Sequence, residues 1–98
     1  MKLEDIKELN EKLNKAEKFG RDIQNLSNAL KIFDKIYSNG IKEGDSISIS
    51  LVEDRTGKVK GVIDIRNNDP TNIHNLLGII SKELFELKQK EELELDRL

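Results

Sequence analysis

SISISLVEDRTGKVKGVIDIR, residues 46–66, is the stretch of sequence that decides the fold. Apolar residues alternate with serines up to Leu51, and Ile63 and Ile65 alternate with charged residues after the turn-forming segment 55–57. Alternation with a period of two predicts a β-hairpin with one apolar face. Because an isolated two-stranded hairpin is at best marginally stable in water, this face has to be covered by flanking helices or by a second chain.

The apolar pattern also predicts the register of the hairpin. A three-residue loop at 55–57, with Gly57 left-handed in a type I turn plus G1 bulge, places Asp54 opposite Lys58. The expected pairs further along are Leu51 with Gly61, Ile49 with Ile63, Ile47 with Ile65, Ser48 with Asp64, Ser50 with Val62 and Val52 with Lys60. A four-residue loop would shift the register by one and mix apolar and polar side chains on each face, so the three-residue loop is preferred.

Helical periodicity precedes the hairpin. A narrow stripe of the coiled-coil kind is formed by Ile6, Leu9, Leu13 and Ala16, and a second apolar set follows at Ile23, Leu26, Leu30, Phe33 and Tyr37. Gly40 suits the end of this helical region. Residues 3–38 fit one helix, with or without a kink at Gly20, or two helices with Asp22 capping the second.

Helical periodicity also follows the hairpin. Asp69 or Thr71 can cap the new helix, and Pro70 suits its first position because a proline there gives up no hydrogen bond. We expect this helix to cover the hairpin with a broad apolar face made of Ile73, Leu76, Leu77, Ile80, Leu84 and Leu87. Residues 88–98 are expected to be a solvated helical end or a tail. The predicted fold is a single α+β domain over residues 1–98, in the order α-β-β-α.

The composition favours self-association and argues against several kinds of function. The 98 residues are 36% hydrophobic and 37% charged, so the core is thin, and we expect a homo-oligomer, for example a dimer, to share its burial. With a net charge of −2, electrostatically driven binding of nucleic acid or membrane by the whole surface is not expected. The absence of cysteine excludes disulfides and thiolate catalysis. No apolar run reaches membrane-span length, and we expect a cytoplasmic protein whose composition is typical of an AT-rich bacterium or its phage.

No constellation of residues points to catalysis. His74 is the single histidine and is expected to be a surface or helix-start residue, because no second histidine or cysteine accompanies it as a metal ligand. The serines lack a nucleophile elbow, and the glycines are too scattered for a phosphate-binding loop. We therefore expect no enzyme, no cofactor and no metal.

Two kinds of surface are candidates for binding. An oligomer or partner interface is predicted at the N-terminal stripe residues Ile6, Leu9 and Leu13 and along the uncharged strand edge at Ser46, Ser48, Ser50 and Val52. An alternative contact for nucleic acid or another anion is offered by the basic residues Arg55, Lys58, Lys60 and Arg66, although acidic residues lie among them.

The function predicted from these surfaces is protein binding. We expect a small non-enzymatic interaction protein, an oligomeric adaptor or inhibitor of another protein. Nucleic-acid binding by the basic hairpin is the alternative, and a small anionic ligand held at a subunit interface is a further one.

Overall fold

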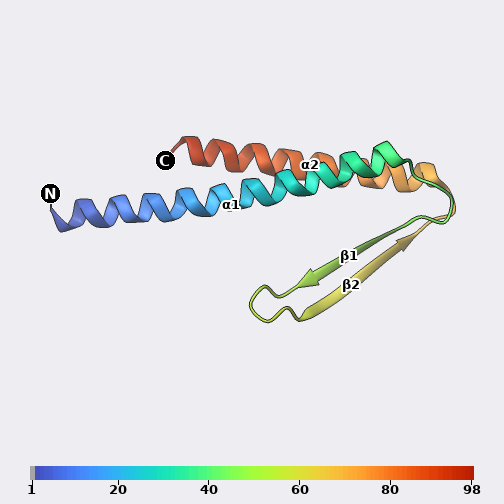
Figure 1. Ribbon diagram of the computed structural model, residues 1–98, viewed down its shortest axis with the longest axis horizontal. Coiled ribbons are helices and arrows are strands. Elements are labelled where there is room, and N and C mark those ends of the chain that lie inside the picture. The colour runs from blue at the N-terminus through green and yellow to red at the C-terminus, as the bar shows by residue number, and fades with distance from the viewer. Residues whose placement is uncertain (1) are drawn as a thin grey trace.

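The computed structural model describes residues 2–98 and contains two helices and one hairpin. The elements are α1 (Leu3–Asn39), β1 (Ser46–Val52), β2 (Val59–Arg66) and α2 (Pro70–Asp96), so the predicted α+β fold in the order α-β-β-α is confirmed. The helices lie side by side and antiparallel, and the hairpin leaves the end where they join and runs back at an angle to them (Figure 1). α1 passes through Gly20 as one helix.

The helix ends follow from local chemistry. Gly40 ends α1 with a φ of 81°, and its N–H donates to the carbonyls of Ile36 and Tyr37. At the start of α2, the Asp69 carboxylate accepts a hydrogen bond of 2.9 Å from the N–H of Thr71, and Pro70 occupies the first turn. Of the two predicted caps, Asp69 is therefore the one that is used.

The register of the hairpin is as predicted from Ser46 to Leu51 and is shifted beyond that point. Ile47 pairs with Ile65 and Ile49 with Ile63, but Val52 pairs with Val59. The predicted pairing of Val52 with Lys60 is therefore wrong, because Lys60 is an extra residue that forms a bulge on β2.

The loop is also longer than predicted. The N–H of Glu53 donates to the carbonyl of Lys58 at 2.9 Å, and the N–H of Gly57 donates to the carbonyl of Glu53 at 2.8 Å. Glu53 and Lys58 therefore close a loop of residues 54–57, and the predicted pairing of Asp54 with Lys58 is wrong. The extra loop residue and the extra bulge residue compensate, so the apolar pairs keep their register. Gly57 has the expected positive φ, 71°.

The two helices meet along a seam of partly buried residues. On α1 these residues are Ala16, Phe19, Ile23, Leu26, Leu30, Phe33 and Tyr37. At the position where Gly20 interrupts the apolar pattern, the neighbouring Phe19 is partly buried in the seam and Gly20 itself is exposed. Leu9, Ala16 and Ile23 form a row along α1, with Phe19 and the later seam residues on one side of it and Ile6 and Leu13 on the other. The apolar stripe therefore shifts around the helix axis between the two halves of α1. Leu87, expected on the apolar face of α2, is exposed.

The core is confined to the junction between the hairpin and the helices. Its buried members are Ile47, Ile73 and Leu77, and Phe33, Ile36, Tyr37, Ile41, Ile65 and Leu76 pack around them. α2 covers the base of the hairpin, where Ile47 packs with Ile73 and Leu77, but Leu51 and Ile63 at the far end remain exposed. The radius of gyration is 18.5 Å, compared with about 13 Å for a compact chain of this length.

Candidate protein-interaction site

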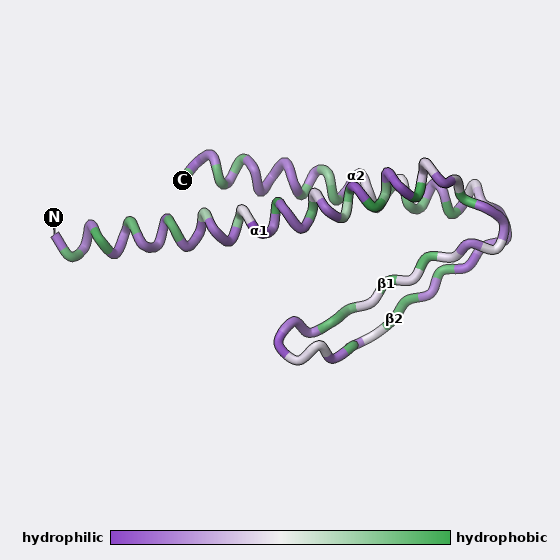
Figure 2. Tube along the Cα trace, viewed as in Figure 1, coloured by the Kyte–Doolittle hydropathy of each residue, from purple (hydrophilic) through white to green (hydrophobic). Residues whose placement is uncertain are grey.

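The hairpin has an inner face, Ile47, Ile49, Leu51, Ile63 and Ile65, that is buried at one end and exposed at the other. Ile47 is 8% exposed, whereas Leu51 is 66% and Ile63 is 61% exposed. In Figure 2 the hydrophobic segments of β1 and β2 continue along the hairpin away from the helices. This face supplies large aliphatic side chains that the chain itself does not cover.

A groove of about 570 Å³ lies between β1 and the helices at the junction. α1 contributes Ile32, Phe33 and Ile36, α2 contributes Ile73, Leu77 and Ile80, and the connection and β1 contribute Ile41, Asp45, Ser46, Ile47, Ser48 and Ile49. Asp45 is the one charged lining residue, and its carboxylate already accepts a hydrogen bond of 2.8 Å from the N–H of Lys42. The groove is thus apolar, and its strand wall is made by β1 without β2.

The edge of β1 that lies along this groove is free of charged side chains. Ser46, Ser48, Ser50 and Val52, the predicted edge residues, are all exposed. The edge of β2 differs, because it carries the bulge at Lys60 and the charged residues Asp64 and Arg66. A bulge and charges discourage the addition of a strand, so β1 is the edge open to pairing.

The N-terminal part of α1 forms a second apolar surface. Leu3, Ile6, Leu9 and Leu13 are all exposed, Leu13 by 54%. With a rise of about 1.5 Å per residue, α1 is about 55 Å long and α2 about 40 Å, and Figure 1 shows α1 extending beyond the end of α2. We call Leu3, Ile6, Leu9 and Leu13 the N-terminal stripe. It lies at the opposite end of the helices from the groove.

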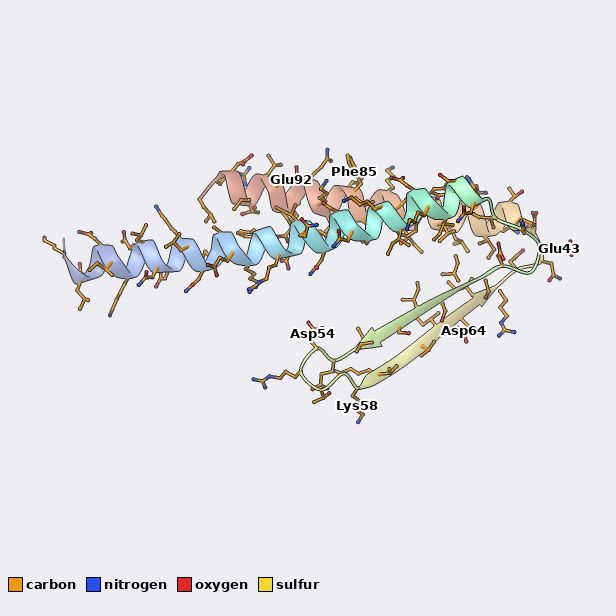
Figure 3. All side chains as sticks on the ribbon, in the orientation of Figure 1. Glu43, Asp54, Lys58, Asp64, Phe85 and Glu92 are labelled. Carbon is orange, nitrogen blue, oxygen red and sulfur yellow. The ribbon has the colours of Figure 1, made fainter. Side chains whose placement is uncertain are left out.

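The basic residues of the hairpin are not one patch. Arg55 lies in the loop, Lys58 closes the loop and Lys60 forms the bulge, so these three share the tip. Arg66 pairs with Ser46 at the other end of the hairpin, about 20 Å from Lys60 at the usual rise of a strand. Figure 3 shows Asp54 and Lys58 together at the tip, with Asp64 farther along β2.

His74 is exposed and lies in α2, with its ring against Tyr37 at a centroid distance of 5.0 Å. Within residues 2–98 no group of three or more histidine, aspartate or glutamate side chains is placed to hold a metal ion. None of the helices in the described part of the chain is both long enough and apolar enough to span a membrane.

Two residues of the helical wall of the groove did not stand out in the sequence pattern. Ile32 and Ile36 line it, and Ile32 remains 57% exposed. Both fall outside the spacing of the helix seam, and an isoleucine off the seam of an amphipathic helix was the available signal.

No protein-family model, curated protein or solved structure matches this chain.

Proposed function

We propose that this chain is a non-enzymatic interaction protein, an oligomeric adaptor that associates with itself at one end and holds a second protein at the other. The observation that carries the proposal is the presence of two separate exposed apolar surfaces on a molecule 64 Å long. One surface combines the inner face of the hairpin with the groove, and the other is the N-terminal stripe. Two surfaces far apart allow two binding events that do not compete for the same residues.

Self-association is supported by the exposed area. The accessible surface is 8154 Å², whereas a compact monomer of 11.2 kDa exposes about 5,700 Å². The excess is about 2,450 Å² per chain, or about 4,900 Å² for two chains, and obligate homodimers bury roughly 2,000–5,000 Å² in total. Burial of the inner face and the groove in a dimer would bring the exposed area toward that of an ordinary compact protein.

The N-terminal stripe suits a helix of another protein. Its apolar residues recur at spacings of three and four, and charged residues of both signs flank them, which is the pattern of a helix-to-helix seam. α2 does not reach this part of α1, and the stripe lies on a different side of α1 from the α2 seam. A helix that docks here would use its own apolar residues at the same spacing.

The basic residues at the tip of the hairpin are a poor site for nucleic acid. Glu53 and Asp54 lie beside Arg55 and Lys58, and Arg66 is at the far end of the hairpin. A phosphate backbone is bound by several cations that act together. We therefore place protein binding first.

The adaptor role is tested by site-specific photo-crosslinking in the cells that make the protein. A photoreactive amino acid at position 9 should crosslink to one other protein, and the same group at position 11, on the opposite side of α1, should not. Leu13→Glu should abolish the crosslink from position 9 while leaving the oligomer mass unchanged. Crosslinks from position 9 to copies of this chain alone, or equal yields from positions 9 and 11, would overturn the adaptor role.

A further inference from the structure

We propose that a second copy of this chain occupies the groove, through antiparallel pairing of β1 with β1 of the second copy about a two-fold axis at Ile49. The result is a dimer with a four-stranded sheet. This inference rests on the self-association in the proposed function, and it adds the strand, the register and the groove that is filled.

The backbone of β1 is directed correctly for this pairing. Glu53 makes its backbone hydrogen bonds toward the β2 side of the hairpin. Backbone groups alternate in direction along a strand, so those of Ile47, Ile49 and Leu51 also point to β2. The N–H and C=O groups that point to the open edge are those of Ser46, Ser48, Ser50 and Val52. A two-fold axis at Ile49 makes these residues the hydrogen-bonded pairs, Ser48 with Ser50 and Ser46 with Val52.

The side chains are self-complementary in the same register. Ile49 lies opposite Ile49 of the second copy, and Ile47 lies opposite Leu51 of the second copy. The apolar residues therefore stay on one face of the enlarged sheet and the serines on the other. A register displaced by one residue would place isoleucines opposite serines and mix the two faces.

The position of the groove supports the same arrangement. β1 forms its strand wall, with Ser46, Ile47, Ser48 and Ile49 among the lining residues. A strand added to β1 therefore enters the groove from its open side. Antiparallel pairing brings Leu51 of the second copy next to Ile47, which packs with Ile73 and Leu77. The exposed end of one inner face is then covered by the helical junction of the other chain.

The dimer closes on itself. After pairing, the outer edges of the four-stranded sheet are the two β2 strands. Each carries the Lys60 bulge and the exposed residues Asp64 and Arg66. These features oppose further strand addition, so two-fold pairing is expected to stop at a dimer and not to continue into a filament.

Single-cysteine variants of the full chain test the register, because the natural sequence contains no cysteine. In Ile49→Cys the two thiols of a dimer lie in a directly opposed pair that is not hydrogen-bonded, at a separation that a disulfide can span. In the matched control Ile63→Cys the thiols are separated by two β1 strands, roughly 14 Å at the usual strand spacing. Under mild oxidation Ile49→Cys should form covalent dimer at least tenfold faster than Ile63→Cys on a non-reducing gel. Equal rates, or no dimer from Ile49→Cys, would overturn the register.

Light scattering of the unmodified chain separates this inference from the proposed self-association. A solution mass of twice 11.2 kDa is expected, and Ser48→Pro should halve it, because it removes an N–H that points away from β2. A chain that is monomeric at high concentration would overturn both the pairing and self-association. A dimer in which the two cysteine variants react equally fast would overturn the pairing and leave self-association standing.

Discussion

Ile47 of β1 packs with Ile73 of α2, the most buried side chain in the described structure at 2% exposure. Two residues farther along the same face of β1, Ile49 is exposed. The boundary between covered and uncovered hairpin therefore falls within a single strand. The fully buried core of the isolated chain is the few residues at the junction, and Ile49, Leu51 and Ile63 farther along the inner face of the hairpin are exposed.

The junction core predicts a large effect of Ile73→Ala on stability. Removal of a buried isoleucine side chain costs the lost burial and leaves a cavity, so we expect the free energy of unfolding to fall by about 2–5 kcal/mol. The matched control is Ile79→Ala in the same helix, where the isoleucine is 61% exposed and the change should be below about 0.5 kcal/mol. Urea unfolding at one fixed protein concentration measures both. Similar losses in the two variants would mean that the junction is not the principal core.

The cap of α2 gives a second prediction. Asp69→Ala removes the carboxylate that accepts from the N–H of Thr71, and we expect a loss of about 1 kcal/mol in the free energy of unfolding. Asp69→Asn keeps a side-chain oxygen in the same place and should restore most of the loss. If the asparagine variant is as unstable as the alanine variant, the hydrogen bond is not the source of the effect.

The loop of the hairpin gives a third prediction, on the stability of a glycine variant. Gly57 has a φ of 71°, a backbone conformation in which an L side chain is strained. Gly57→Ala should therefore lower the free energy of unfolding by about 1 kcal/mol. Gly61→Ala is the matched control on the same strand pair, because no atom lies within 4 Å of the added Cβ and its φ is not positive. An equal loss at position 61, where the φ is not positive, would show that the left-handed backbone of Gly57 is not the source of the effect.

The central register was predictable because side chains on β1 and β2 alternate between two faces. Only one pairing puts Ile47 opposite Ile65 and Ile49 opposite Ile63 with all four on one face. The loop length was not predictable by the same reasoning. A longer loop together with the bulge at Lys60 leaves those pairs unchanged, so the apolar pattern cannot distinguish it from the shorter loop.

The angle between the hairpin and the helices could not be predicted from the sequence either. Periodicity identifies which side of each element is apolar, but the angle is set by how Ile41, Ile47 and Ile73 pack at the junction. The groove exists because of that angle, so its lining residues could be recognised only as apolar and not as a site. The edge residues of β1 and the residues of the N-terminal stripe could be named without that angle, because each set is defined by the pattern within one element.

The two halves of α1 should differ in stability. Leu26 packs in the seam with α2, whereas Leu9 is exposed. We expect Leu26→Ala to lower the free energy of unfolding by about 1–3 kcal/mol, and Leu9→Ala to change it by less than about 0.5 kcal/mol. Isolated helical segments of about a dozen residues are marginal in water. The backbone amides of residues 5–13 should therefore exchange with solvent much faster than those of residues 23–37 in the purified protein.

Hydrogen exchange followed by mass spectrometry measures this difference directly, and the Leu9→Ala and Leu26→Ala variants provide its controls. Leu26→Ala should speed exchange in residues 23–37, and Leu9→Ala should leave that segment unchanged. Slow exchange in residues 5–13 of the purified protein would show that the N-terminal stripe is already covered by a second copy of the chain. In that case the stripe would belong to the oligomer interface, and the surface for another protein would have to lie elsewhere on the molecule.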